Sequence, residues 1–239
     1  MLICRIVRRF EAHFLVAIKG LTERQIRRRE NILSAARKLL TKHGVDGVTM
    51  RTLAKQSGVA PKTLYHQFGS KENLLRTAVE ERYRYYYRMI DEEDIAHGID
   101  RLFYIVDAVT ATTQKNKAYA RALSPLVQND PDRAFLAIRN RTYRKAINQI
   151  ADEGGFLSWV QVDLIAAIIF RQMSPAYVSS WLVRGSWDLV ASITKLELSL
   201  VLVSITKGYT HKKAAATIKT MQKELKGFGE RWSTELGAG

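Results

Sequence analysis

Residues 49–71, TMRTLAKQSGVAPKTLYHQFGSK, predict two short helices joined by a tight turn. Thr49 stands where an N-cap belongs, ahead of apolar residues that recur at helical spacing. These apolar residues are Met50, Leu53 and Ala54. Gly58 is expected to end the first helix, because glycine enters the left-handed conformation without a Cβ clash, and Pro61 suits the first turn of the second. Two helices joined in this way form a helix-turn-helix, which places its second helix in the major groove of DNA.

The second helix of this pair is predicted to be apolar on one side only. Leu64 and Phe68 lie four residues apart, so both can face the core. The side chains left for solvent or a ligand are Lys62, Thr63, Tyr65, His66 and Gln67. We expect Lys62, Thr63 and His66 to contact base edges. Lysine can donate to guanine acceptors, and threonine can give a hydrogen bond or a methyl contact to thymine.

The positive charge of the chain is concentrated in its first part. The net charge is +15, and residues 1–90 hold 19 Lys and Arg against 7 Asp and Glu. Residues 91–239 hold 19 against 16. A field of this kind attracts a polyanion and supplies the salt-dependent part of DNA affinity. The asymmetry therefore favours nucleic acid as the partner of the half that holds the helix-turn-helix.

A long helix is predicted ahead of this motif, from Thr22 to His43, with Gly44 ending it. Its start is crowded with basic residues, which oppose the helix dipole there. They are Arg24, Arg27, Arg28 and Arg29. Contacts with phosphates or a minor groove would account for this local cost, and a solvated charged face is the alternative. Residues 1–21 are expected to form a poorly anchored N-terminal extension whose role is open. The alternatives are an amphipathic helix and a basic arm that adds phosphate contacts.

The run from Ile32 to Leu75 resembles the DNA-binding domain of TetR-type (tetracycline-repressor-like) transcriptional regulators. The resemblance rests on AARKLLTKHG, GVTMRTLAKQSGVAPKTLYHQF and SKENLL, in that order and with the family's spacing. It implies an all-α protein: an N-terminal three-helix helix-turn-helix DNA-binding domain, followed by a C-terminal helical ligand-binding and dimerisation domain. These domains are expected at residues 22–70 and 71–239, with a connecting helix over 71–90.

Further DNA contacts are expected from the resemblance and from a helix end. Tyr65 and Lys71 match family positions that hold phosphates. Thr49 lies at a helix N-terminus, where backbone N–H groups favour phosphate, and Arg51 is a further phosphate candidate. The expected partner is double-stranded DNA with a palindromic operator, because a two-fold dimer reads two half-sites.

The chain after residue 100 is predicted to be helical throughout. Two adjacent, strongly apolar helices, around 159–184 and 187–207, need a partner surface. The resemblance implies that they pair with their copies in a homodimer, and the alternative is that both are internal core of a monomer. Ser158 is expected to cap the first of them, and Pro175 to kink or split it. Thr210 is expected to cap a last helix.

The other helices of that part are expected to enclose a small-molecule pocket, as the resemblance implies. The aromatic residues that could line the pocket are Phe103, Tyr104, Tyr119, Phe135, Tyr143, Phe170 and Tyr177. Their apolar character suggests an apolar or aromatic effector. In the family mechanism, the ligand favours a dimer whose recognition helices are spaced wrongly for DNA, and repression is relieved.

Composition and motifs argue against an enzyme, a metal site or a membrane protein. The five histidines show no metal-ligand spacing, and Cys4 alone supplies neither an intramolecular disulfide nor a multi-cysteine metal site. No Gly-rich phosphate loop or nucleophile elbow is present, so no catalytic residue and no cofactor is expected. The apolar segment 189–206 contains Lys195 and Glu197, which favours a buried helix over a membrane span. The protein is expected to be soluble and cytoplasmic.

The function that these features predict is a ligand-responsive DNA-binding regulator of transcription. A repressor released by its effector is the main hypothesis. Two alternatives stay open: an activator of the same fold, and a DNA-binding protein without an effector. The length of the helical part after residue 95 argues against the second alternative, because DNA binding alone needs far less chain.

Overall fold

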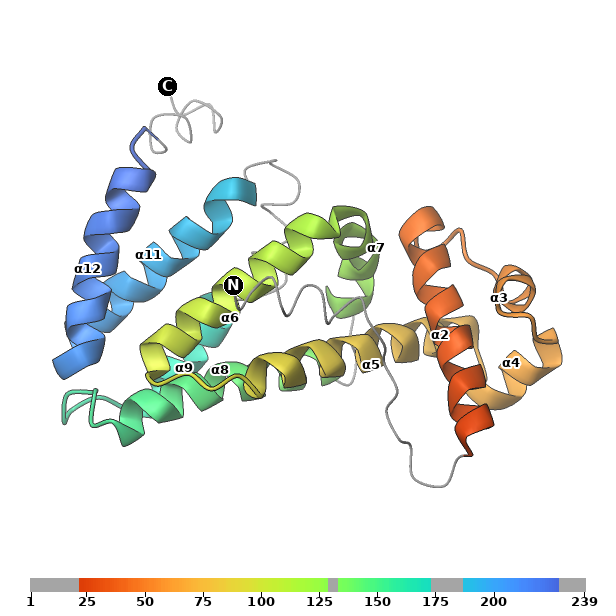
Figure 1. Ribbon diagram of the computed structural model, residues 1–239, viewed down its shortest axis with the longest axis horizontal. Helices are drawn as coiled ribbons and strands as arrows, with labels where there is room; N and C mark the ends of the chain where they lie inside the picture. The colour runs from red at the N-terminus through yellow and green to blue at the C-terminus, as the bar shows by residue number, and fades with distance from the viewer. Residues whose placement is uncertain (1–21, 129–132, 173–186, 228–239) are drawn as a thin grey trace. The chain divides into compact units, whose positions relative to one another are not determined.

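The computed structural model describes residues 22–128, 133–172 and 187–227, and every regular element in these ranges is an α-helix (Figure 1). The all-α prediction is therefore confirmed. The chain divides into two compact units, cut between residues 92 and 93, 111 and 112, and 139 and 140. The first unit holds the chain up to Glu92 together with Thr112–Arg139, and the second holds the remainder. The bounds predicted for the two domains, 22–70 and 71–239, stay a prediction.

The first unit is built from helices with strong local start signals. Its complete helices are α2 (Glu23–His43), α3 (Met50–Ser57), α4 (Pro61–Phe68), α5 (Lys71–Asp91) and α7 (Lys117–Gln128). Thr22 and Thr49 each form a capping box with the residue three positions on, and the Ser70 hydroxyl accepts from the backbone N–H of Asn73. These caps satisfy donors that have no partner within the helix, and they fix where three of the helices begin.

One hydrophobic core joins the helix-turn-helix to the helices that follow it. The buried members from α2, α3 and α4 include Ile32, Leu33, Leu40, Leu53, Leu64 and Phe68. Leu74, Leu75 and Val79 of α5 and Phe135 of α8 complete the same cluster, and Leu123 of α7 packs against it. The core of the first unit thus extends well past the three predicted DNA-binding helices.

The second unit contains most of α6 (Gly98–Lys115) and α8 (Ala134–Asp152), and also α9 (Val162–Gln172), α11 (Trp187–Ile205) and α12 (Gly208–Glu224). Helices α11 and α12 run side by side (Figure 1). The segment before α9 is tied to the turn between them, because Leu157 N donates to Ile205 O at 3.0 Å and Lys207 N donates to Gly155 O at 2.8 Å.

Two of the predicted helix starts in this unit are wrong. The helix expected from Ser158 begins at Val162 instead, since the chain around Phe156 forms a β-bridge with Thr206 and then a turn. Thr210 is not a cap: it lies buried inside the first turn of α12, and Lys207 holds the N-cap position. Pro175 and the end of the predicted 159–184 helix lie outside the described residues, as does the 1–21 extension.

Candidate nucleic-acid interface

The turn between α3 and α4 has the geometry of a tight helix-turn-helix. Gly58 takes φ 68° and ψ 30°, the left-handed conformation that glycine was expected to supply. The backbone N–H groups of Gly58 and Val59 both donate to the carbonyl of Ala54, and these two bonds close the C-terminal end of α3. Two residues later Pro61 begins α4, where its missing N–H leaves no bond unmade.

Helix α4 presents one apolar and one polar face. Leu64 and Phe68 are 0% and 4% exposed and belong to the core. Lys62, Tyr65, His66 and Gln67 are exposed, Tyr65 to 54%, and Thr63 is half-buried. A tyrosine this exposed beside a lysine, a histidine and a glutamine supplies donors, acceptors and stacking area without any role in the core.

The N-terminus of α3 carries two of the predicted phosphate contacts. Thr49 is exposed, and its hydroxyl accepts from the backbone N–H of Thr52 at 3.1 Å. The Thr49 hydroxyl also lies 3.2 Å from Thr52 Oγ1, and a rotation about its C–O bond would turn its proton toward a phosphate oxygen instead. Arg51, in the first turn, is exposed as well. A threonine cap with backbone N–H groups behind it is a suitable anion site at this position.

Lys71 makes a contact that was not predicted from the sequence. The Nζ atom lies 3.4 Å from the carbonyl oxygen of Val45, in the connection between α2 and α3, and 3.6 Å from a carboxylate oxygen of Glu72. Its side chain is only 24% exposed. An ammonium group carries three N–H donors, so the same side chain can hold this connection and still donate to a phosphate.

The four arginines at the start of α2 separate into two kinds. Arg24, Arg27 and Arg28 are exposed, and Arg27 makes an exposed pair with Glu23 at 3.8 Å. Arg29 points inward: its Nη2 lies 2.7 Å from Glu81 Oε1, and its guanidinium lies 5.1 Å from the centre of the Phe68 ring. The sequence analysis predicted the same role for all four arginines. The structure shows that Arg29 differs from the other three, because it pairs with Glu81 and stacks on Phe68.

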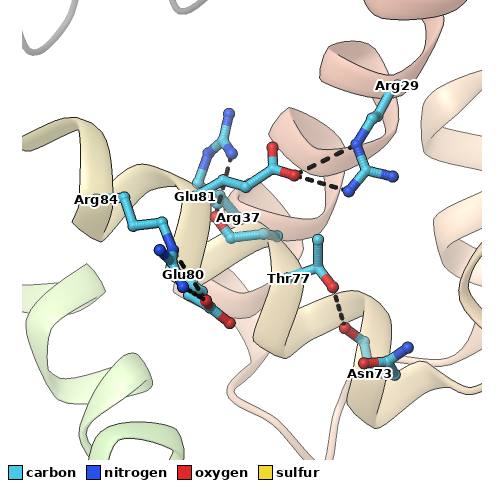
Figure 2. Close-up of polar contacts among 8 residues, drawn as sticks. Arg29, Arg37, Asn73, Thr77, Glu80, Glu81 and Arg84 are labelled. Atoms are coloured by element: carbon cyan, nitrogen blue, oxygen red, sulfur yellow. Dashed lines mark hydrogen bonds and ion pairs between the residues drawn. The ribbon is translucent and has the colours of Figure 1, made fainter. Parts of the chain in front are cut away.

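A second polar network joins α2 to α5 beside this pair (Figure 2). Arg37 pairs with Glu30 and donates to the carbonyl of Ala78 at 3.2 Å. Burial raises the pKa of Glu30 in spite of its Arg37 partner, and burial lowers the pKa of Arg82 nearby. Polar contacts therefore hold α5 to α2 over two successive turns of α5. No spacing rule could have found them, because Arg29 and Glu81 are 52 residues apart.

The aromatic residues predicted to line a pocket fall into different surroundings. Phe135 belongs to the core of the first unit and the partly buried Tyr119 packs against that core, where burial raises the pKa of Tyr119 to about 12. In the second unit, Phe103 is buried, and Tyr143 lies edge-on to Phe170 with 6.4 Å between the ring centroids. Tyr104 is half-buried in the same unit. Tyr177 lies outside the described residues.

Buried charge in the second unit was not foreseen from the sequence. Lys195 of α11 contacts Asp107 of α6 at 2.5 Å, and both side chains are less than a third exposed. The buried Arg101 donates to Gln149 Oε1 at 2.7 Å and to the carbonyls of Glu93 and Ile95.

Among the described residues, no group of three His, Cys, Asp or Glu side chains is placed to hold a metal ion. No helix in those same ranges is both long and apolar enough to cross a membrane.

Comparison with known proteins bears on this interface directly. Residues 32–78 match the family model described as bacterial regulatory proteins, tetR family. The chain is 30% identical over 88 residues to the HTH-type transcriptional regulator UidR of Escherichia coli K12, an alignment that covers 36% of this chain. It spans 43% of UidR, less than half of that protein's length.

Two further similarities extend over most of the chain. The HTH-type transcriptional repressor KstR2 of Mycobacterium tuberculosis H37Rv is 27% identical over 192 residues, covering 75% of this chain and 94% of that protein. The crystal structure of the transcriptional regulator FadR from Bacillus subtilis in complex with stearoyl-CoA superposes with a TM-score of 0.57 at 15% identity. That match covers 80% of this chain and 96% of FadR, and at such identity it shows the fold alone.

Proposed function

The chain belongs to the TetR family of DNA-binding transcriptional regulators, a non-enzymatic family, and from this premise we propose that it represses transcription from a palindromic operator. The observation that carries the proposal is the two-faced helix α4, which buries Leu64 and Phe68 and exposes Lys62, Tyr65 and His66. Thr49, Arg51 and Lys71 then hold phosphates on either side of it, while Lys62, Thr63 and His66 meet base edges. A regulator of transcription acts where the DNA is, so the proposed location is the cytoplasm.

The proposal includes a homodimer formed through the helices around 159–184 and 187–207. Leu164 of α9 and Leu200 of α11 support it, because these large apolar side chains are 55% and 51% exposed in the single chain. Exposed leucines on adjacent apolar helices favour burial against a partner surface. Two-fold symmetry also presents two recognition helices to the two halves of a palindrome.

A small apolar or aromatic effector that relieves repression completes the proposal. Tyr104 supports it, since its hydroxyl is buried and has no hydrogen-bond partner among the described residues. Burial raises the pKa of Tyr104, so the hydroxyl stays protonated and can donate. A buried donor without a partner is costly unless a ligand satisfies it. Phe103, Tyr143 and Phe170 lie in the same unit, and FadR of B. subtilis is a protein of similar fold that binds stearoyl-CoA.

The DNA-contact residues can be tested on an operator selected from a randomised duplex library. Lys62→Ala and Thr63→Ala are expected to change which operator sequence binds best, each losing about 1–3 kcal/mol of discrimination at one position. Lys71→Ala is expected to weaken all sequences alike and to lower the salt slope by about 1. Fluorescence anisotropy with labelled duplexes at several salt concentrations measures both effects.

The matched control for these variants is Lys212→Ala, which removes an exposed lysine from α12 of the second unit. It should leave both discrimination and salt slope unchanged. Full retention of discrimination by the Lys62 and Thr63 variants would show that the base contacts are assigned to the wrong residues. A reporter gene placed behind the selected operator separates a repressor from an activator by the sign of its response.

The effector site can be tested with stearoyl-CoA as the probe. Binding is expected to raise the operator Kd by about 5–150-fold, the usual range for coupled sites. Tyr104→Phe removes only the hydroxyl, so it should weaken this response and leave operator affinity without the probe unchanged. An unaltered operator Kd at saturating stearoyl-CoA would exclude long acyl-CoA thioesters as the effector class.

A further inference from the structure

Arg29 makes two different contacts with the two sides of its guanidinium group. The edge donates from Nε at 3.3 Å and from Nη2 at 2.7 Å to Glu81 Oε1 of α5, as the paired dashed lines in Figure 2 show. The face lies over the ring of Phe68, with 5.1 Å from Cζ to the ring centroid. Phe68 is the last residue of α4, so one side chain of α2 contacts both the recognition helix and the helix that follows it.

We propose that Arg29 is a positioning residue for operator binding, which holds the C-terminal end of α4 against α5 and does not itself contact DNA. The proposal rests on the proposed function, in which α4 meets the bases. Its geometry is favourable: the Arg29 and Glu81 side chains are 23% and 24% exposed, and the Phe68 ring is buried. Partial burial strengthens both the ion pair and the cation–π contact relative to an exposed site.

A second contact at the same place supports this role. Asn73 Nδ2 of α5 donates to the carbonyl oxygen of Phe68 at 2.8 Å, so the backbone at the end of α4 is also tied to α5. Arg29 adds the side-chain half of this attachment. A recognition helix held in its bound orientation loses less conformational freedom on binding DNA, and affinity rises for that reason.

The chemistry requires arginine and not merely a positive charge. A guanidinium is planar, so its edge can bind a carboxylate while its face stacks on an aromatic ring. Lysine has a compact ammonium group and cannot keep both contacts with one orientation. Arg29→Lys therefore preserves the charge that a phosphate contact would need and removes the geometry that positioning needs.

The neighbouring Arg28 provides the matched control, because it lies one position away on α2 and is exposed. Operator Kd values are measured across a salt series, at a temperature where circular dichroism shows every variant fully folded. Arg29→Ala and Arg29→Lys are both expected to raise the operator Kd about tenfold with the salt slope unchanged, since no phosphate contact is lost. Arg28→Ala is expected to lower the salt slope by about 1, as the loss of one phosphate contact does.

Two results of the affinity measurements would overturn the proposal. A salt slope that falls in Arg29→Ala and recovers in Arg29→Lys would make Arg29 a phosphate contact. Wild-type operator affinity in both folded variants, with only a lower melting temperature, would show that the contacts of Arg29 with Glu81 and Phe68 serve stability alone. If Arg29→Ala does not fold, the operator Kd and the salt slope of Arg29→Lys and Glu81→Gln are compared with those of the wild type instead.

Hydrogen exchange without DNA gives an independent readout. Arg29→Lys is expected to speed amide exchange in residues 61–68 more than in residues 50–57, because Arg29 contacts α4 through Phe68, whereas the contacts that the structure describes for Arg29 do not include α3. Equal exchange in α4 of the wild type and the variant would overturn the positioning role. If the wild-type chain selected no operator, the proposed function would fail, and the exchange comparison would still decide whether Arg29 holds α4.

Discussion

Phe135→Ala is expected to lower the free energy of unfolding of the first unit by about 3–5 kcal/mol. Phe135 is 1% exposed and is among the largest fully buried side chains of the described chain. Its ring meets Tyr83 edge-on, with 5.4 Å between centroids and 88° between planes. Truncation would leave a cavity in the core that also contains Leu64 and Phe68 of the recognition helix. Urea unfolding followed by circular dichroism measures the loss.

Leu136→Ala is the matched control for this substitution. Leu136 is the next residue of α8 and is 37% exposed, so a loss of about 0.5–1 kcal/mol is expected there. Similar losses at the two positions would contradict the burial on which the prediction rests. Operator affinity should fall more in Phe135→Ala than in Leu136→Ala. The recognition helix packs in the core of the first unit, so it loses its structure when that unit unfolds. A Phe135 variant of wild-type stability that loses only its effector response would instead support the pocket role inferred from the sequence.

Local signals predicted the helix-turn-helix well, because they act within a few residues. The Thr49 cap, the Gly58 turn and the Pro61 start all lie where the spacing placed them. The polar face of α4 also followed from the two apolar residues Leu64 and Phe68, since both are in the core. Each of these features depends on hydrogen bonds or steric limits inside one turn or one helix.

The contacts that position those elements could not be predicted, because they join distant parts of the chain. Arg29 and Glu81 resemble any other exposed helical charges until α2 and α5 are packed together. Phe135 looks as much like a pocket residue as a core residue in the sequence, and only packing with Tyr83 decides its surroundings. The same limit explains the wrong helix start at Ser158, where tertiary pairing of Phe156 with Thr206 overrides a local capping pattern.

Gly98→Ala is expected to destabilise the second unit by about 3 kcal/mol, near the upper end for overpacking. A Cβ atom at Gly98 would lie 2.5 Å from Ile150 Cγ1, 2.6 Å from Ala146 O and 2.6 Å from Ile150 N. Two of these atoms are backbone, so a side-chain rotation cannot relieve the contact and α6 must move away from α8. That movement would also strain the Arg101–Gln149 hydrogen bond between the same helices. Thermal and urea unfolding of the purified variant measure the loss.

Gly154→Ala separates this steric effect from the ordinary cost of replacing a glycine. Gly154 lies in the same unit with φ +64°, and a Cβ atom there would meet nothing within 4 Å. Its replacement should cost only the strain of a left-handed alanine, about 1–2 kcal/mol. A larger loss of unfolding free energy in Gly154→Ala than in Gly98→Ala would show that α6 and α8 separate easily where Gly98 approaches Ile150. The close approach would then not set the spacing of the two helices that carry Tyr104 and Tyr143, and the effector response should survive Gly98→Ala unchanged.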